Sequence, residues 1–320
     1  MSDVEKALAE QHEQNVLRAA HRNSGLWDDT LLERYVNRRD LVAFMDETHR
    51  ALPNGQLGYY GMSAVVFHAD DLPEIRRDLE TIAGGSFWHA KEAAKSARDD
   101  YRIADMSSYI ASRSDLPVMV FDMRPQEITE SQERPVRDDC LRRAMQVLDE
   151  QGVTDVVLDQ FPARFQHNVQ LDQAVLRSLK ATGAVDDQMW MHHARMSEEH
   201  ALWSADTVAW AVQRHNYGTR ASDSRHVAPL SGRLQEVHAR SGVRVDLTTA
   251  PRADLAGSEG RVRRGAPITS MNDRLNAARR RAQAGPGARS PRVVPGGQAS
   301  RLDMPKAPPI QGPEGPSRSL

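Results

Sequence analysis

Cysteine is almost absent from this sequence of 320 residues, which contains only Cys140. A single thiol excludes an intramolecular disulfide and any zinc site built from several cysteines, so we expect Cys140 to be a core residue. Long apolar runs are also missing: none approaches the roughly 18 residues that span a bilayer, and the N-terminus lacks the pattern of a secretion signal. We therefore predict a cytoplasmic protein with no membrane contact. The chain also lacks a glycine loop that cradles phosphates, which weakens the case for a nucleotide hydrolase.

The net charge of −2 conceals an uneven distribution of charge. Residues 251–320 contain 13 Lys and Arg against 5 Asp and Glu, a net charge of +8, and the first 250 residues contain 29 basic and 39 acidic residues, a net charge of −10. From residue 285 the chain is rich in Pro, Gly, Ser and Arg, and such a composition buries too little apolar surface to offset the entropy cost of ordering. We predict that residues 218–320 form a largely disordered basic tail, in which short helices can form near 230–241 and 271–283. The tail either contacts nucleic-acid phosphates or is a solvated linker without a role.

Apolar periodicity divides the rest of the chain into two parts. Residues 1–39 read as two helices, 4–23 and 27–39, which form a lead-in that packs on the sheet or on a partner. Residues 40–217 alternate between strands and helices and are expected to form one α/β domain. Its predicted strands are 40–48, 58–67, 116–123, 153–160 and 187–196, and its predicted helices are 72–82, 100–113, 134–151, 168–181 and 198–215. Three strands followed by helix, strand, helix, strand and helix is the order of ribonuclease H-like folds, which have a mixed five-stranded sheet flanked by helices.

Three aspartates occupy positions that are costly for a carboxylate. Asp46 follows five consecutive apolar residues at the end of the first predicted strand, and Asp159 ends the fourth predicted strand in the same way. Asp206 lies on the apolar side of the last predicted helix, because a helical wheel places it between Leu202 and Trp210. An ionised carboxylate is expensive to bury unless it binds a cation or another partner. Together the three side chains predict a divalent-metal site of hard oxygen ligands.

Two further candidates lie in the segment 86–92. If this segment is helical, His89 and Glu92 are one turn apart and share a face, so both can reach the same site as a metal ligand or a proton carrier. A surface pair is the commoner explanation of an isolated His-x-x-Glu, so the value of the motif depends on the fold. Glu47 is adjacent to Asp46 on a strand and should point to the opposite face, which makes it a second choice.

The histidine pair and the tryptophans have simpler explanations. His192 and His193 are adjacent on a strand and face opposite ways, so they cannot chelate one ion side by side. Trp190, Trp203 and Trp210 are expected to pack in the core rather than to form a platform for stacked bases.

Five segments of the chain resemble, in order, the motifs of a known family. They are Phe44-Met-Asp-Glu-Thr48, Tyr59-Tyr-Gly-Met-Ser-Ala-Val-Val66, His89-Ala-Lys-Glu92, Val156-Val-Leu-Asp-Gln160 and Ser204-Ala-Asp-Thr-Val-Ala-Trp-Ala-Val212. The family is the one catalogued as domain of unknown function 3800, which is regarded as ribonuclease H-like and is common in bacteria and their mobile elements. The resemblance spans residues 40–215, and the Ala-Asp pair within the last apolar helix is its most specific piece. The first motif of the family continues Asp-Glu-Ser-Gly, whereas this chain has Asp46-Glu47-Thr48-His49, so the turn beside Asp46 differs.

The resemblance implies a site made of Asp46, Glu92, Asp159 and Asp206, with His89 beside Glu92. In such a site the four carboxylates bind two Mg²⁺ or Mn²⁺ ions bridged by Asp46, and phosphodiester bonds are hydrolysed by a two-metal mechanism. His89 assists proton transfer, for which an unperturbed pKa of about 6.5 is suited. We therefore expect a metal-dependent nuclease that acts on DNA or RNA. The alternative is a non-catalytic protein of a mobile element that binds nucleic acid or a protein partner, and a third possibility is a hydrolase of another phosphate ester.

Overall fold

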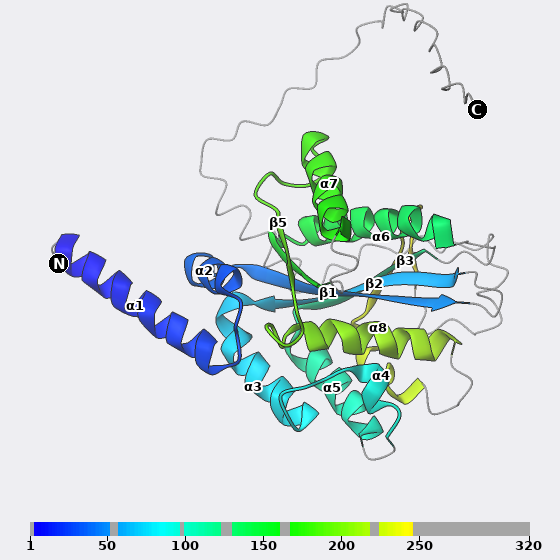
Figure 1. Ribbon diagram of the computed structural model, residues 1–320, viewed down its shortest axis with the longest axis horizontal. Helices are drawn as coiled ribbons and strands as arrows, with labels where there is room; N and C mark the ends of the chain where they lie inside the picture. Colours follow the sequence, from blue (N-terminus) through cyan, green and yellow to red (C-terminus); the bar gives the residue numbers. More distant parts are fainter. Residues whose placement is uncertain are drawn as a thin grey trace, which may run out of the picture. The chain divides into compact units, whose positions relative to one another are not determined.

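A mixed sheet is the central layer of the protein (Figure 1). It has seven strands in the order β5-β4-β1-β2-β3-β6-β7. The strands are β1 (Leu41–Ala51), β2 (Leu57–His68), β3 (Leu116–Asp122), β4 (Asp155–Asp159), β5 (Trp190–Ala194), β6 (Gln235–His238) and β7 (Arg244–Val245). Strand β2 is antiparallel to both β1 and β3, whereas β4 is parallel to both β1 and β5. The computed structural model describes residues 3–51, 57–96, 99–122, 130–160, 167–217 and 224–245.

Helices cover both faces of this sheet (Figure 1). One face carries α6 (Glu130–Glu150) and α7 (His167–Ala181), and the other carries α3 (Leu72–Ala83), α5 (Asp100–Arg113) and α8 (Leu202–Tyr217). Helices α1 (Asp3–Asn23) and α2 (Asp29–Asn37) precede β1, and the single-turn helix α4 (Ala90–Ala93) lies against α8. Within the described ranges, no helix is long and apolar enough to cross a membrane.

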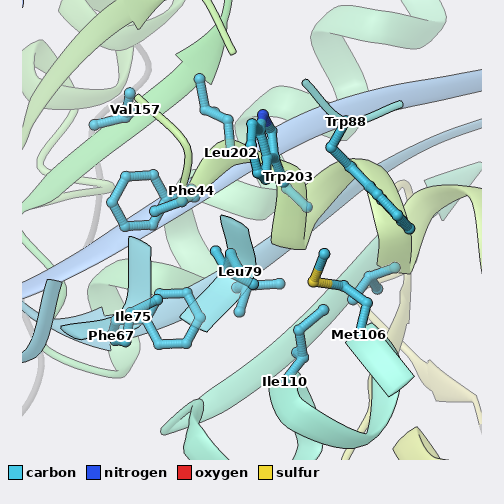
Figure 2. Packing of buried hydrophobic residues seen from close by; sticks show 14 of the residues in the cluster. Phe44, Phe67, Ile75, Leu79, Trp88, Met106, Ile110, Val157, Leu202 and Trp203 are labelled. Carbon is cyan, nitrogen blue, oxygen red and sulfur yellow. The ribbon is translucent and has the colours of Figure 1, made fainter. Parts of the chain in front are cut away.

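Each face of the sheet has its own hydrophobic core because side chains alternate between the two faces of a strand. On β1, Phe44 points to the α8 face and Met45 points to the α6 face. Figure 2 shows the core on the α8 side, in which Phe44 and Trp203 lie among aliphatic side chains from α3 and α5. Trp203 and Trp210 are buried, and Cys140 is a buried free thiol on the α6 side, so these predicted core positions are confirmed.

The antiparallel pair of β1 and β2 is longer than the sequence predicts. Its register continues to Ala51 opposite Leu57, whereas the parallel pairing of β1 with β4 stops at Met45 opposite Leu158. Asp46 is therefore not at the end of a strand, and the prediction that places it there is wrong. The residues after Met45 remain in strand because β2 continues beside them after β4 has ended.

The α/β class is confirmed, and strands lie at the five predicted segments, but the sheet contains two more strands. Gln235–His238 pairs parallel with β3, and Arg244–Val245 pairs antiparallel with Gln235–His238. The prediction of five strands is therefore too low, and the helix predicted at 230–241 is wrong because pairing with β3 overrides the local pattern. The domain accordingly extends past residue 217. The helix predicted at 271–283 and the rest of the predicted tail lie outside the described residues.

The N-terminal helices pack on the same compact unit as the sheet. Helix α2 buries its apolar side, including Tyr35, in the core on the α8 side. A buried ion pair anchors the end of α1: Arg76 of α3 donates hydrogen bonds of 2.6 and 2.7 Å to the two oxygens of Glu199, and its Nη1 lies 3.0 Å from His21 Nδ1. Helix α2 and the end of α1 therefore pack on the sheet domain, whereas residues 4–16 of α1 are exposed, so the partner alternative is left open for them.

Candidate metal centre

Asp46 and Asp159 are neighbours on adjacent parallel strands. They directly follow the last residue pair of the ladder between β1 and β4. Adjacent strands lie about 4.8 Å apart. The two carboxylates point to one face of the sheet because Phe44 and Val157, two residues earlier on the same strands, both lie in the core on the α8 side. The predicted convergence of these two aspartates is therefore confirmed, although only Asp159 ends its strand.

Helix α8 brings Asp206 over the same face of the sheet. Ser63 lies opposite Asp46 on β2, and its hydroxyl donates a hydrogen bond of 2.7 Å to the carbonyl oxygen of Ala205. This contact fixes the turn of α8 that carries Asp206 above strand β1. The Asp206 side chain is only 5% exposed, so the prediction that this aspartate faces the core is confirmed.

Burial and neighbouring charges change the protonation of two of the three carboxylates. Burial raises the pKa of Asp46 well above its usual value, and the negative charges of Asp206 and Asp159 raise it further. The pKa of Asp159 is also raised, to about 6. Burial and the charge of Asp206 raise this pKa, whereas a hydrogen bond from the backbone of Gln160 lowers it. Such mutual repulsion is typical of acids that share a functional site.

Groups at the start of α4 hold Asp206. His89 Nδ1 lies 3.1 Å from Asp206 Oδ1, and the N–H of Ala90 donates to Asp206 Oδ2 at 2.6 Å. The hydrogen bond to Asp206 is the largest effect on the pKa of His89, which is raised although burial opposes the change. Because 45% of the His89 side chain is exposed, a proton on this ring can be exchanged with solvent or given to a ligand.

Glu92 does not share a helical face with His89. His89 has an extended backbone with φ of −156°, and α4 begins after it at Ala90. The condition that the whole segment 86–92 is helical is therefore not met, because His89 is the residue that caps α4, although the charges of His89 and Glu92 still affect each other's pKa. The Glu92 side chain is half exposed and both of its oxygens accept hydrogen bonds of 2.7 Å from Lys95 Nζ, which lowers the pKa of Glu92.

A pocket of about 100 Å³ lies where β4 ends. Its polar lining consists of Asp46, Glu47, Arg137, Asp159 and Gln160. Side chains from both faces of β1 border this space because β4 no longer covers the edge of β1 beyond Asp46. This is why Glu47 reaches the same pocket as Asp46, although the two side chains point to opposite faces as predicted.

Sequence reasoning missed a charged network on the α6 side of Glu47. Arg137 of α6 donates to Glu47 at 2.7 Å and also pairs with Asp172 of α7. His193 Nε2 lies 3.0 Å from Asp172 Oδ2, on the opposite side of β5 from His192, as predicted. One sequence signal was available for Asp172. The residues three, four and seven positions after it are apolar, and this helical spacing predicts that Asp172 lies on the buried side of α7.

The donor set suits Mg²⁺ or Mn²⁺, because carboxylate oxygens are ligands that these hard cations prefer. Among the residues that the structure describes, however, no group of three or more His, Cys, Asp or Glu side chains is arranged to hold an ion. Both oxygens of Asp206 are engaged by His89 and Ala90, and Asp46 Oδ1 accepts the N–H of Glu47 at 2.7 Å. Coordination by all three aspartates therefore requires Asp206 to exchange at least one of its bonds.

Comparisons with known proteins assign no family to this chain. No protein-family model matches it, and no curated protein matches its sequence. The function of the site is therefore inferred from its geometry and chemistry and from the sequence motifs described above.

Proposed function

We propose that this chain is a metal-dependent nuclease with a ribonuclease H-like domain. The observation that carries the proposal is the convergence of Asp46 and Asp159 on adjacent parallel strands, with Asp206 above them. The strand order β3-β2-β1-β4-β5 also supports it, because in ribonuclease H-like folds the first and fourth strands are neighbours and bring their carboxylates together. The ordered motifs that resemble the family of domain of unknown function 3800 favour the same assignment.

The charges of the site favour a cation as its ligand. Burial and the charges of Asp206 and Asp159 raise the pKa of Asp46, and like charges this close destabilise the folded chain unless a positive charge neutralises them. A protein that only binds nucleic acid has no use for this convergence, since carboxylates repel phosphates. A divalent cation removes both difficulties because it offsets the repulsion and attracts a phosphodiester group.

Each polar group has a distinct role in this proposal. Asp46 and Asp159 would hold the cation, and Asp206 would join them by exchanging its bond with His89 or with the backbone of Ala90. When bound, Mg²⁺ or Mn²⁺ would activate a water and stabilise the departing 3′ oxygen of a phosphodiester. His89 lies 3.1 Å from Asp206 and 45% of its side chain is exposed, so it is placed to give a proton to the departing oxygen, and the hydrogen bond to Asp206 raises its pKa.

Two parts of the proposal reach beyond the three aspartates. Glu92 joins the ligand set when its bond to Lys95 opens. Residues 251–320, with their net charge of +8, supply the phosphate contacts that the acidic body of the protein lacks. The proposed substrate is accordingly a nucleic acid, either DNA or RNA.

Cleavage of labelled single-stranded and double-stranded DNA and RNA tests the proposal. We expect the wild-type protein to cleave at least one of these substrates in millimolar Mg²⁺ or Mn²⁺ and to lose this activity in EDTA and in Asp46→Asn. The matched control is Asp187→Asn, which removes an exposed carboxylate before β5, at the end of the sheet away from Asp159. Activity retained in a folded Asp46→Asn variant contradicts the assignment. Binding without cleavage under every condition favours the alternative, a non-catalytic nucleic-acid-binding protein.

A further inference from the structure

Two aromatic side chains are exposed close to the elements that carry the three carboxylates. Trp27 is 64% exposed in the turn between α1 and α2, and Phe87 is 72% exposed in the segment that leads into α4. An apolar ring of this size gains free energy when it is covered. Neither ring has a role in holding a cation, so each is available to a substrate.

Contacts with α8 hold the segment of Phe87 beside Asp206. Trp88 is buried in the core on the α8 side (Figure 2), and its Nε1 donates a hydrogen bond of 3.1 Å to Thr207 Oγ1. On the other side of Trp88, His89 has an extended backbone and lies 3.1 Å from Asp206. Because Trp88 points into the core between two exposed neighbours, Phe87 and His89 both face solvent. The Phe87 ring is therefore exposed next to the imidazole that touches Asp206.

Trp27 is bound to the segment that follows β5. Its N–H donates a hydrogen bond of 3.0 Å to the carbonyl oxygen of Glu198. In the same segment, Arg195 Nε donates to Gln160 Oε1 at 3.2 Å. Gln160 directly follows Asp159 and lines the pocket with it. Trp27 therefore lies on the Asp159 side of the candidate site.

An exposed cation accompanies each aromatic ring. Lys91 is exposed at the second position of α4, and the Arg195 side chain is 65% exposed after β5. The acidic side chains of the same two segments are occupied: Glu92 pairs with Lys95 at 2.7 Å, and Glu198 lies 3.9 Å from Arg195. Each ring thus has a cation nearby that can bind a phosphate.

The charge of the protein body favours stacking as a source of affinity. The first 250 residues carry a net charge of −10, so much of this surface repels phosphates. A base stacked on an aromatic ring adds affinity that does not depend on charge. Such stacking requires an unpaired base, because in a duplex the faces of each base are covered by its neighbours.

We propose that a single-stranded nucleic acid crosses the three carboxylates between Trp27 and Phe87, with one base stacked on each ring. The inference rests on the proposed nuclease function, which it deepens by naming the substrate class. Arg195 and Lys91 contact phosphates on the two sides of the scissile bond. Stacking reads no base edge, so we expect no strong sequence preference.

Binding of labelled oligonucleotides tests the two stacking contacts. A single strand of mixed sequence and its duplex are titrated with the full-length protein in Ca²⁺, binding is followed by fluorescence anisotropy, and the length of the oligonucleotide is checked afterwards. Phe87→Ala and Trp27→Ala should each weaken binding of the single strand about tenfold, as expected for the loss of one stacked base. Binding of the duplex should not change.

Three control variants separate stacking from other effects. Phe87→Tyr keeps a flat ring and should keep the affinity for the single strand. Phe87→Leu is apolar but not flat, so it should lose affinity as Phe87→Ala does. Leu171→Ala shortens an exposed apolar side chain of α7, on the other face of the sheet, and should bind like the wild type.

The opposite results overturn the proposal. They are no binding of the single strand by the wild type, an unchanged affinity in either alanine variant, or a loss of duplex affinity as large as the loss of single-strand affinity. Equal binding by Phe87→Leu and Phe87→Tyr also overturns it, because an apolar contact is then sufficient without stacking. Circular dichroism checks that each variant is folded.

Cleavage in Mn²⁺ separates this inference from the proposed function. Cleavage of the single strand that falls in both alanine variants supports both proposals. Cleavage that is equal in the wild type and in both alanine variants supports the nuclease function and overturns the stacking contacts. Single-strand binding that depends on both rings, without any cleavage, supports the stacking contacts and overturns the nuclease function.

Discussion

In the absence of divalent cations, Asp159→Asn should stabilise the protein. Burial and the charge of Asp206 raise the pKa of Asp159 from 3.8 to about 6, so the ionised side chain is less favourable in the folded chain than in the unfolded chain. The folded state is penalised fully above pH 6, and the penalty fades as the pH falls toward 3.8. The difference between the two pKa values corresponds to about 3 kcal/mol at pH 8 and about 1.5 kcal/mol at pH 5. Because Asp159 is partly exposed, both figures are upper values.

Urea unfolding in EDTA, followed by circular dichroism, measures this effect. Asparagine keeps one oxygen for the backbone N–H of Gln160 and loses the second acceptor, which reduces the gain by about 1 kcal/mol at either pH. The decisive quantity is the unfolding free energy of the variant minus that of the wild type, which should decrease by up to about 1.5 kcal/mol between pH 8 and pH 5. Asp187→Asn, which removes an exposed carboxylate at the other end of the sheet, is measured alongside as the matched control. A difference that stays constant with pH, or a variant less stable than the wild type at pH 8, refutes the reasoning.

Three further predictions concern stability and pH. Burial and the charge of Arg76 lower the pKa of His21 from 6.5 to about 4, so the protein loses stability as the pH falls from 6.5 toward 4. Urea unfolding should show a loss of about 2 kcal/mol in the unfolding free energy between pH 7 and pH 5. The same pH change should cost the His21→Gln variant less unfolding free energy. Arg76→Met leaves the buried Glu199 carboxylate without its positive partner and should lower the unfolding free energy by about 3–5 kcal/mol. The double variant Arg76→Met with Glu199→Gln should lose less unfolding free energy than the two single variants lose together. Mn²⁺ affinity, measured by electron paramagnetic resonance, should fall between pH 7 and pH 5 because protons compete for Asp159; an affinity independent of pH contradicts this.

The convergence of the three aspartates could be predicted because each depends on a local pattern. The apolar residues before Asp46 and Asp159 identify buried strands, and parallel neighbouring strands present equivalent residues at the same level. The burial of Asp206 follows from helical periodicity alone. Asp46 was nevertheless misplaced at a strand end, since the length of β1 is decided by its pairing with β2.

Contacts between distant segments account for what the sequence could not provide. The start of α4 is one such place, because the N–H of Ala90 donates to Asp206, which lies more than a hundred residues later in the chain. Glu47 has its ion-pair partner in the buried Arg137 of α6, and no local pattern marks an arginine for burial. The short strand β6 exists because β3 offers it an edge, a tertiary effect that outweighs the propensity of its own residues.

Thermal unfolding with and without millimolar Mn²⁺, on wild type and Asp46→Asn side by side, tests the metal centre most directly. Because a ligand that binds only the folded state stabilises it, the wild type should unfold at a higher temperature in Mn²⁺. Asp46→Asn should lose this increase, and Asp187→Asn should keep it. An equal response of wild type and Asp46→Asn, or no response of either, contradicts a cation site at Asp46, Asp159 and Asp206.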